Sequence, residues 1–442
     1  MSEIKKIGKG LIIAAPRSGA GKTTVMLGLC KAFTERGIKV QPYKNGPDYI
    51  DPAFHKVATG HNSGNLDSWA MNRAEIINQL ISSKGDLILF EGSMGLFDGV
   101  SDVGSFGTGA TADIARLTGW PVILVLDASG QAQSAAAVAK GFYTFDSDVK
   151  IAGVILNNVS SLRHKRLLED GMSRADIKVL GCLPRNKELM LPERHLGLIQ
   201  AEEISDLNSI MTNLSQFMLK NCNLDEIIKC ANSLKAEHSL GNIISIKPPG
   251  QRIAMARDKA FAFIYPHLID SWRNQGAEIL YFSPLKNETP NPNADIVWLP
   301  GGYPELYAGH IASANKFLDG LRHFSLSKPV HGECGGYMVM GEGLIDAKGC
   351  NHKMAGILGL VSSFKDRKMK LGYRRAQMNE NILSFSKNDI ISGHEFHYSS
   401  IVSQPDVPLA EITDANNEKV SETGSRRNFA SGTFFHVIAR MI

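Results

Sequence analysis

Two segments of this chain carry residue types whose spacing suits chemistry, and the first is a cysteine between glycines. Residues 330–336 read Val-His-Gly-Glu-Cys-Gly-Gly and place Cys334 at the end of a predicted buried strand. A thiol that projects from a tight strand-to-helix turn needs small neighbours, because the strained turn brings backbone close to backbone. Cys334 is therefore our candidate nucleophile. The alternative interpretation, a buried structural cysteine, leaves the flanking glycines unexplained.

A cysteine nucleophile needs a base that takes its proton. The segment Gly432-Thr433-Phe434-Phe435-His436 offers His436, whose alternative role is that of a packed or capping side chain. Residues 393–398, Gly-His-Glu-Phe-His-Tyr, are a competing source of histidines. Two histidines three residues apart with a glutamate suggest a metal, but the segment favours a strand and lacks a third or fourth ligand, so we expect no metal there.

Negative charge that develops on a substrate at this thiol needs hydrogen-bond donors. The run Gly301-Gly302-Tyr303-Pro304-Glu305 directly follows a predicted strand over residues 296–299, and such a glycine turn exposes backbone amides. The amides of Gly302 and Gly335 are therefore our candidate oxyanion donors.

The second chemical motif is Gly19-Ala20-Gly21-Lys22-Thr23-Thr24, which follows a predicted strand and opens a predicted helix. Its backbone amides would cradle phosphate groups at the helix N-terminus, Lys22 would neutralise their charge, and Thr23 would offer its hydroxyl to Mg²⁺. Pro16 replaces the first glycine of the commonest pattern, which lowers the specificity of the motif on its own. The alternative is a glycine-rich turn that binds nothing.

Acidic residues downstream of this loop suit a divalent cation. Residues 46–52, Gly-Pro-Asp-Tyr-Ile-Asp-Pro, hold two carboxylates three residues apart, and Glu91 ends a predicted strand. Ligands of open α/β sheets bind at the carboxyl ends of the strands, and Mg²⁺ prefers hard oxygen ligands. Thr23, Asp48 and Glu91 are therefore our predicted metal ligands.

Two further carboxylates, Asp51 and Asp98, have a functional and a structural interpretation of equal weight. They could hold the metal, or they could orient a substrate together with Asp48. They could equally be carboxylates that close turns or cap helices.

These motifs need elements that position them, and the hydrophobic pattern predicts buried parallel strands. Short apolar runs recur in both halves, and their continuous rather than alternating hydrophobicity indicates burial on both faces. Helical spacing occurs between them, for example over residues 25–36 and 73–82. Both halves are therefore predicted to be α/β. The predicted strands are residues 11–15, 87–90, 122–126 and 151–156, then 253–256, 278–282, 296–299 and the run before Cys334.

Composition limits the class of protein. The 442 residues allow two ordinary cores, and a net charge of +4 is too small to predict a nucleic-acid partner. Six cysteines without short paired spacing predict a reducing compartment, and the first apolar run is too short for a signal or membrane segment, so we expect a cytoplasmic protein. A polar, helix-like segment over residues 205–240 and Pro-Pro-Gly at 248–250 predict domains 1–245 and 246–442.

Taken together, the motifs resemble the cobyrinic or hydrogenobyrinic acid a,c-diamide synthase family of cobalamin biosynthesis. The resemblance rests on residues 15–24, 44–52, 91–99, 301–305 and 393–398, which follow the family's order over nearly the whole chain. The first half is similar to dethiobiotin synthetases, which accounts for the missing first glycine. The second half resembles class I glutamine amidotransferases.

The resemblance implies a P-loop, parallel-sheet ATPase-like domain that binds ATP and the corrinoid, followed by a flavodoxin-like amidotransferase domain. Cys334 would release ammonia from glutamine with His436 as general base and acid, and the ammonia would pass internally to the first domain. There ATP and Mg²⁺ would convert a carboxylate into an acyl phosphate, near Asp48, Asp51 and Asp98, for ammonia to displace. The family amidates the a and c acetate groups of a corrin ring. The partners implied are small molecules rather than nucleic acid or membrane, and such enzymes commonly form homodimers.

One residue departs from the amidotransferase pattern. Class I enzymes generally carry His-x-Glu at the end of the catalytic triad, whereas this chain reads His436-Val437-Ile438. The site therefore works either as a Cys-His dyad or with another carboxylate that orients His436. A thiol is nucleophilic enough to tolerate the loss of the third member.

Two rival functions share parts of these motifs. The first is a,c-diamidation of nickel sirohydrochlorin by the same family, although residues 432–439 resemble enzymes of the aerobic cobalamin pathway and so favour hydrogenobyrinic acid. The second is a regulatory or partitioning ATPase with the same phosphate loop. This rival leaves Cys334 and the Gly301-Gly302 turn unexplained.

Overall fold

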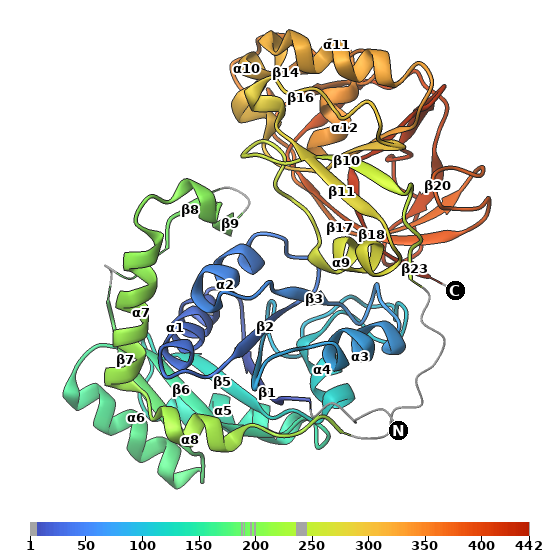
Figure 1. Ribbon diagram of the computed structural model, residues 1–442. Helices are drawn as coiled ribbons and strands as arrows, with labels where there is room; N and C mark the ends of the chain where they lie inside the picture. Colours follow the sequence, from blue (N-terminus) through green and yellow to red (C-terminus); the bar gives the residue numbers. More distant parts are fainter. Residues whose placement is uncertain are drawn as a thin grey trace. The chain divides into compact units, whose positions relative to one another are not determined.

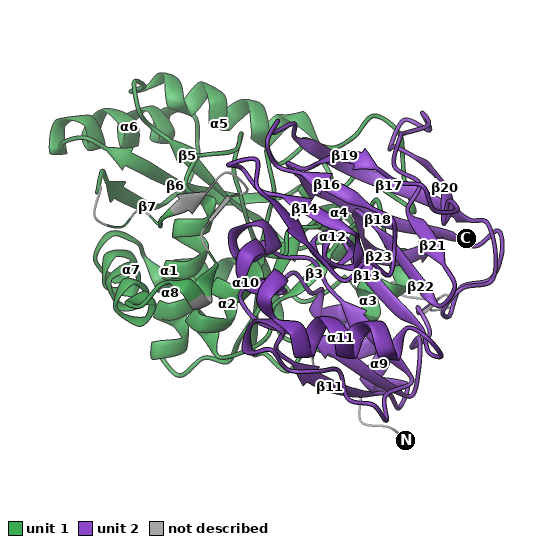
Figure 2. Ribbon diagram, turned by 90° about the horizontal axis from the view of Figure 1, so that it is seen from above, with its two compact units in different colours: residues 1–243 green, residues 244–442 purple. Residues whose placement is uncertain are grey.

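The computed structural model of the chain describes residues 7–186, 189, 191–194, 197–198, 200–235 and 245–441. The chain divides into two compact units, Met1–Ile243 and Ile244–Ile442, which Figure 2 draws in green and purple. The predicted boundary near residue 245 adjoins residues 236–244, which lie outside the described part, as does the end of the predicted polar segment 205–240.

Strands and helices alternate through most of unit 1 (Figure 1). The strands are β1 (Lys9–Ala14), β2 (Val40–Asn45), β3 (Gly64–Leu66), β4 (Leu87–Glu91), β5 (Val122–Asp127), β6 (Ile151–Val159), β7 (Val179–Pro184), β8 (Glu193–Arg194) and β9 (Gly197–Leu198). The helices are α1 (Lys22–Glu35), α2 (Asp51–Thr59), α3 (Arg73–Ile81), α4 (Thr111–Thr118), α5 (Ser134–Phe145), α6 (Leu162–Arg174), α7 (Leu207–Asn221) and α8 (Leu224–Cys230), with a 3₁₀ turn at Ala201–Glu203.

A parallel sheet in the order β3-β2-β4-β1-β5-β6-β7 forms the centre of unit 1. All five residues of β4 are buried, as continuous apolar runs predict for a strand covered on both faces. The connections after β1, β2 and β4 leave the sheet at the same edge. The sheet therefore brings the phosphate loop, the Asp48 turn and Glu91 together.

Unit 2 begins in the same way and ends in a series of strands. Its strands are β10 (Arg252–Ala256), β11 (Glu278–Phe282), β12 (Ile296–Leu299), β13 (Val330–Glu333), β14 (Gly343–Ile345), β15 (Asn351–Lys353), β16 (Val361–Ser363), β17 (Lys370–Met378), β18 (Ile390–His397), β19 (Ser400–Ser403), β20 (Ala410–Thr413), β21 (Ser425–Arg427), β22 (Ala430–Thr433) and β23 (Phe435–Met441). Its helices are α9 (Pro266–Asn274), α10 (Ala308–Ser313), α11 (Asn315–Phe324) and α12 (Gly335–Met340), with 3₁₀ turns at Pro284–Lys286 and Pro304–Tyr307.

The main sheet of unit 2 has the order β11-β10-β12-β13-β22-β21, in which β11 to β22 run parallel and β21 joins antiparallel. A separate antiparallel sheet, β20-β17-β18-β23, carries the last strand. The apolar runs in the sequence predicted the parallel strands β10 to β13 but not this second sheet. Both units are α/β, as predicted.

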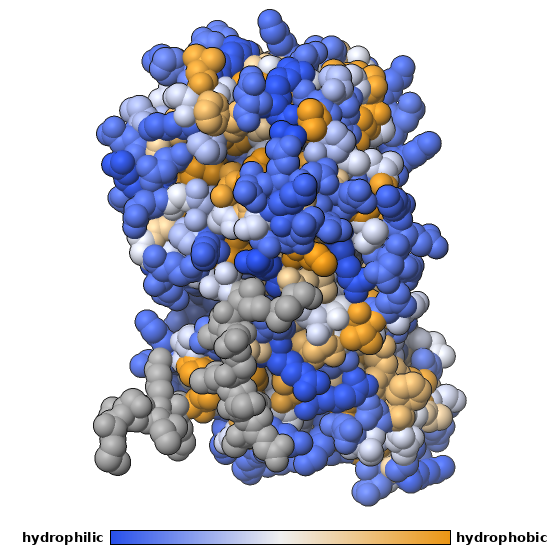
Figure 3. Space-filling model, turned by 90° about the vertical axis from the view of Figure 1, so that its right-hand side faces the viewer, coloured by the Kyte–Doolittle hydropathy of each residue, from blue (hydrophilic) through white to orange (hydrophobic). Residues whose placement is uncertain are grey.

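Polar residues dominate the face shown in Figure 3, and hydrophobic residues gather there in separate patches. Large hydrophobic side chains with high exposure in the described residues include Phe145, Leu162 and Leu326. Among the described residues, no helix combines the length and hydrophobicity needed to span a bilayer.

Candidate active sites

The phosphate loop of unit 1 joins β1 to α1 at the carboxyl edge of the sheet. Gly19 and Gly21 have φ angles of 74° and 94°, a left-handed conformation that glycine adopts without strain. Among the described residues, no side chain caps the first turn of α1, so its backbone amides point outward from the helix N-terminus. This geometry suits a phosphate group.

Lys22 lies inside the loop rather than in solvent. Its Nζ donates hydrogen bonds to the carbonyl oxygens of Met94 at 2.6 Å and Arg17 at 3.2 Å. Burial, followed by the nearby Lys44, lowers the pKa of Lys22 to about 8. A bound phosphate would offset both effects, because it would supply negative charge to a desolvated ammonium.

The acids of unit 1 converge on a lysine that the sequence analysis left without a role. Lys44, at the end of β2, places Nζ 2.5 Å from Asp51 Oδ2, 3.1 Å from Glu91 Oε1 and 3.9 Å from Asp48 Oδ2. Burial opposes the charge of Lys44, but Asp51 and Glu91 outweigh it and raise the pKa of this ammonium above its ordinary value. The network is therefore held together by a protonated lysine.

Glu91 is the centre of this network and is fully buried. Thr23 Oγ1 donates to its Oε1 at 2.7 Å, and His55 Nε2 lies 2.7 Å from its Oε2. Burial alone would raise the pKa of Glu91, but Lys44 and His55 lower it well below the ordinary value. Glu91 is thus an anion within reach of the loop.

The oxygen donors of the predicted metal set fit Mg²⁺. Thr23 and Glu91 touch each other, and Asp48 shares Lys44 as a neighbour with Glu91. Proteins usually hold Mg²⁺ through one or two carboxylates, with phosphate oxygens and waters completing the shell. No group of three or more His, Cys, Asp or Glu side chains within the described ranges forms a full protein cage. These three residues therefore fit an ion that arrives with the nucleotide.

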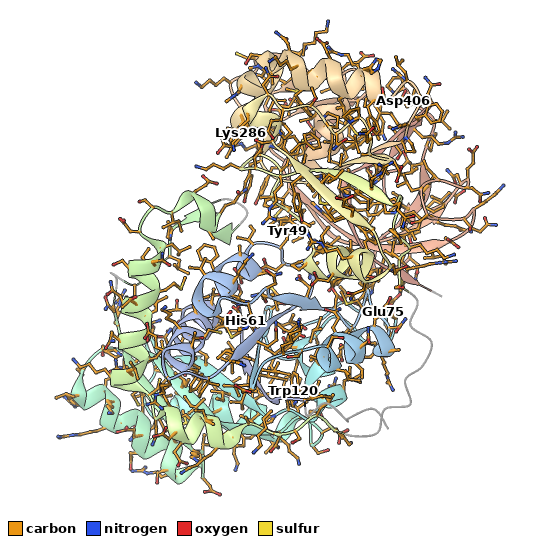
Figure 4. The ribbon with its side chains drawn as sticks, viewed as in Figure 1. Tyr49, His61, Glu75, Trp120, Lys286 and Asp406 are labelled. Carbon is orange, nitrogen blue, oxygen red and sulfur yellow. The ribbon has the colours of Figure 1, made fainter. Side chains whose placement is uncertain are left out.

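The remaining predicted acids differ in their surroundings. Asp48 Oδ1 accepts hydrogen bonds from the backbone of Ile50 and Asp51 at 2.8 and 3.1 Å, so it orders the start of α2. Tyr49, labelled in Figure 4, marks this loop. Asp51 is buried against Lys44, whereas Asp98 is exposed and closes a turn by accepting from the Gly95 amide at 2.8 Å. Asp48 and Asp51 therefore belong to the network around Lys44 and Glu91, whereas Asp98 contacts its own turn.

Cys334 occupies a strained turn between β13 and α12 in unit 2. Its φ of 45° and ψ of −105° are unusual for a residue with a side chain. Its thiol is almost completely buried, and a Cβ on the next residue but one, Gly336, would overlap the Leu299 carbonyl oxygen at 2.0 Å. The glycines therefore allow the close backbone approach predicted for a nucleophile on a sharp turn.

His436 lies beside Cys334, although it comes from the antiparallel sheet. A Cβ built on Gly301 would be 2.2 Å from His436 Cε1, 2.9 Å from His436 Nε2 and 3.3 Å from Cys334 Cβ. One position therefore contacts both predicted catalytic residues. Gly301 leaves open the space between them.

The predicted oxyanion donors also meet at this point. A Cβ on Gly335 would lie 3.1 Å from the Gly302 amide nitrogen, so the two glycines are in close approach. Gly335 opens α12 directly after the cysteine. The two amides therefore lie near the thiol and come from two different segments, the turn after β12 and the start of α12.

Burial sets the charge state of the thiol site. It raises the pKa of Cys334, with Glu305 adding to the effect, and it lowers the pKa of His436 to about 3, with His394 as the next cause. The resting pair is therefore a neutral thiol and a neutral imidazole. Such a pair reacts by transferring the thiol proton to the imidazole as the sulfur attacks.

Three residues with direct contacts to these sites were not assigned by the sequence analysis. They are Lys44, His55 and Glu333. Glu333 precedes the nucleophile, and its Oε2 lies 3.8 Å from His436 Nδ1. The only signals in the sequence were the position of Lys44 at a strand end and the i, i+4 spacing of Asp51 and His55 on α2.

The competing histidines have other partners. His397 Nε2 lies 2.8 Å from Glu395 Oε1, and its ring stacks on Phe434 with 4.4 Å between centroids. His394 pairs in register with His436 across β18 and β23. Arg374 Nε donates to Glu395 Oε2 at 2.6 Å, so the acid is engaged on both oxygens.

Comparison with known proteins matches both halves of the chain. Residues 11–199 match the CobQ/CobB/MinD/ParA nucleotide binding domain, and residues 252–441 match the CobB/CobQ-like glutamine amidotransferase domain. The structural likeness to a solved glutamine amidotransferase is low, with a TM-score of 0.29 and 13% identity over 42% of this chain and 90% of that one.

Full-length relatives are much closer. The hydrogenobyrinate a,c-diamide synthase of Rhodobacter capsulatus is 52% identical, over 98% of this chain and 99% of the relative. Enzymes of the same name from Mesorhizobium japonicum and Agrobacterium fabrum are each 48% identical, with the same coverage.

Proposed function

The chain belongs to the hydrogenobyrinate a,c-diamide synthase family, and from this premise we propose that it amidates the a and c acetate carboxylates of hydrogenobyrinic acid. Glutamine is the nitrogen donor and ATP is the activating agent. The protein is thus a ligase of cobalamin biosynthesis that forms carbon–nitrogen bonds. The observation that carries the proposal is 52% identity along 98% of the chain, which includes both matched domains.

In unit 2, Cys334 transfers its proton to His436 while its sulfur attacks the side-chain amide carbon of glutamine. The amides of Gly302 and Gly335 stabilise the oxyanion that forms. The C–N bond then breaks, and His436 returns the proton to the departing ammonia, which leaves a glutamyl thioester. Water, deprotonated by His436, hydrolyses the thioester to glutamate and restores the thiol.

In unit 1, a carboxylate oxygen of the substrate attacks the γ-phosphorus of ATP, and ADP leaves. The attack gives an acyl phosphate, which ammonia from unit 2 converts into an amide as phosphate departs. Activation is required because ammonia does not displace oxide from a carboxylate at neutral pH, whereas phosphate is a good leaving group. The phosphate loop Gly19–Thr24 grips ATP, and Lys22 supplies positive charge beside the phosphates.

Thr23, Asp48 and Glu91 would hold Mg²⁺ with the nucleotide. The ion would neutralise phosphate charge during transfer. Lys44 keeps Glu91 ionised and holds Asp51 in place by a direct contact, and His55 orients Glu91 from the other side. Asp48 and Asp51 lie next to the transferred phosphoryl group in this proposal, and Asp98 orders the loop that faces Lys22.

We place the reaction in the cytoplasm, where ATP and glutamine are supplied, and all six cysteines are free, as suits a reducing compartment. The partners are the corrinoid, glutamine and ATP. A homodimer is the assembly that the family resemblance implies, and sedimentation analysis tests it.

The alternatives are less well supported. A partitioning ATPase accounts for the first domain match but not for the amidotransferase match over residues 252–441. The relatives named above are hydrogenobyrinate enzymes, which favours that ring over nickel sirohydrochlorin.

Mass spectrometry of the corrinoid after incubation tests the proposal. Hydrogenobyrinic acid with enzyme, ATP, Mg²⁺ and glutamine should gain two amides, and Cys334→Ala should do so only when ammonium replaces glutamine. Parallel incubations contain cobyrinic acid or nickel sirohydrochlorin. If cobyrinic acid or nickel sirohydrochlorin is amidated and hydrogenobyrinic acid is not, the substrate assignment is wrong. If none of the three rings is amidated, the synthetase assignment is wrong.

A further inference from the structure

His436 lacks the carboxylate that class I amidotransferases supply two residues later, because Ile438 occupies that position. The structure puts a different carboxylate at the same nitrogen. Glu333 Oε2 lies 3.8 Å from His436 Nδ1. Both side chains are buried, with relative exposures of 4% and 0%, so water does not screen their interaction.

Glu333 is fixed in this position by two further contacts. Its Oε1 accepts a hydrogen bond from the Val437 amide at 2.9 Å, and the Trp298 side chain also donates to its carboxylate. Val437 is the residue after His436 on β23, whereas Glu333 ends β13. The carboxylate therefore joins the strand that carries the nucleophile to the strand that carries the base.

We propose that Glu333 is a positioning residue that holds His436 with Nδ1 protonated and Nε2 directed toward Cys334. It thereby takes the place of the missing third member of the triad. As the thiol proton moves to Nε2, the imidazole becomes an imidazolium, and the Glu333 carboxylate stabilises that charge through the proton on Nδ1. The inference rests on the proposed glutaminase reaction and concerns only its proton transfer.

The electrostatic surroundings add a pH dependence to this geometry. Burial raises the pKa of Glu333 to about 8. Besides burial, two other titratable groups, His394 and His397 on β18, lower the pKa of His436. Besides burial, the carboxylates of Glu305, Glu395 and Glu333 itself raise the pKa of the Cys334 thiol. Because the carboxylate form is the one that stabilises an imidazolium, glutamine hydrolysis should rise with pH through a limb near pH 8.

The test is glutaminase kinetics of Glu333→Gln in the full chain, measured as glutamate release. The amide keeps the shape of the side chain but removes its charge. We expect kcat to fall about 100-fold with little change in KM, at the lower end of the contribution of general acid–base catalysis. The limb near pH 8 should disappear. Ammonia-dependent amidation should stay within about twofold of the unchanged protein, because it does not use His436.

Two further variants separate charge from shape. Glu333→Asp keeps the charge and should retain more activity than Glu333→Gln, whereas a purely structural role predicts the reverse order. Glu422→Gln is the matched control, because Glu422 is another buried carboxylate of unit 2, and its Oε1 accepts from the Thr433 hydroxyl and the Phe434 amide, both at 2.9 Å. It should hydrolyse glutamine within about threefold of the unchanged protein, as expected for residues that do not act together.

The inference is overturned if Glu333→Gln keeps its kcat or its pH limb, if it loses glutamine- and ammonia-dependent amidation equally, or if Glu422→Gln loses as much. If Glu333→Gln does not fold, Glu333→Asp still tests the proposal against the unchanged protein. A soluble Glu333→Asp protein whose glutamine hydrolysis lacks the limb near pH 8 would contradict the proposal. Failure of the proposed glutaminase reaction itself would give a different result: the Cys334→Ala protein would still amidate the corrinoid with glutamine.

Discussion

A single methyl group at Gly301 should slow glutamine use about 100-fold while leaving the synthetase reaction intact. The methyl of Gly301→Ala would lie 2.2 Å from His436 Cε1 and 2.9 Å from Nε2. Gly301 does not have a positive φ, so alanine adds a steric contact without backbone strain. The imidazole must therefore move to make room.

The size of this movement sets the size of the effect. An ordinary contact needs about 3.4 Å, so the ring must shift by about 1 Å, and a misplacement of that size costs about 100-fold in rate. This corresponds to about 2.7 kcal/mol of transition-state stabilisation. The same methyl would lie 3.3 Å from Cys334 Cβ, so the thiol itself is only slightly crowded.

The assay compares glutamine-dependent with ammonia-dependent amidation of the corrinoid. Gly301→Ala should lose about 100-fold in the first and less than about twofold in the second. Gly309→Ala is the control, because its methyl would approach nothing closer than 3.6 Å and lies in the same unit. Unchanged glutamine hydrolysis in Gly301→Ala would refute the placement of His436 as the base.

Two predictions concern unit 1. Lys44→Met removes the cation that Asp51 and Glu91 share and should destabilise the protein by about 3–5 kcal/mol. The control Lys31→Met breaks a more exposed pair with Glu35 and should cost less than about 1 kcal/mol. Equal thermal midpoints for the two variants would contradict this. Burial raises the pKa of Glu75, labelled in Figure 4, to about 7, so the acid form is favoured in the folded state and stability falls as pH rises from about 4.5 to 7. Glu75→Gln should lack this decline in urea unfolding followed across that pH range.

The sequence was most informative where one strand and the turn after it carry all the necessary residues. The phosphate loop, Glu91 at the end of β4 and Cys334 after β13 each follow a continuous apolar run, so their positions at the sheet edge could be predicted. Helix α1 begins at Lys22, three residues before the start of its predicted segment, because the loop residues themselves form the first turn.

Contacts between segments distant in sequence could not be predicted in the same way. Lys44 and His55 meet Glu91 only because β2 and β4 are neighbours in the sheet and α2 packs against β2. Glu333 stands beside Cys334 in the sequence, yet its partner His436 lies on a strand of another sheet. The pairing of β23 with β18, which sets this contact, joins two strands that β19 to β22 separate in the sequence, and no short motif specifies its register.

The assembly of the thiol site from two sheets also orders its appearance during synthesis. Cys334 leaves the ribosome about a hundred residues before His436, which takes about 5–20 s at ordinary elongation rates. By then all of unit 1 has been made, since its last residue precedes Cys334. His436 reaches Cys334 only when β23 pairs with β18. If Cys334 and His436 release ammonia from glutamine as proposed, a nascent chain cannot do so before unit 1, the proposed consumer of the ammonia, has been synthesised.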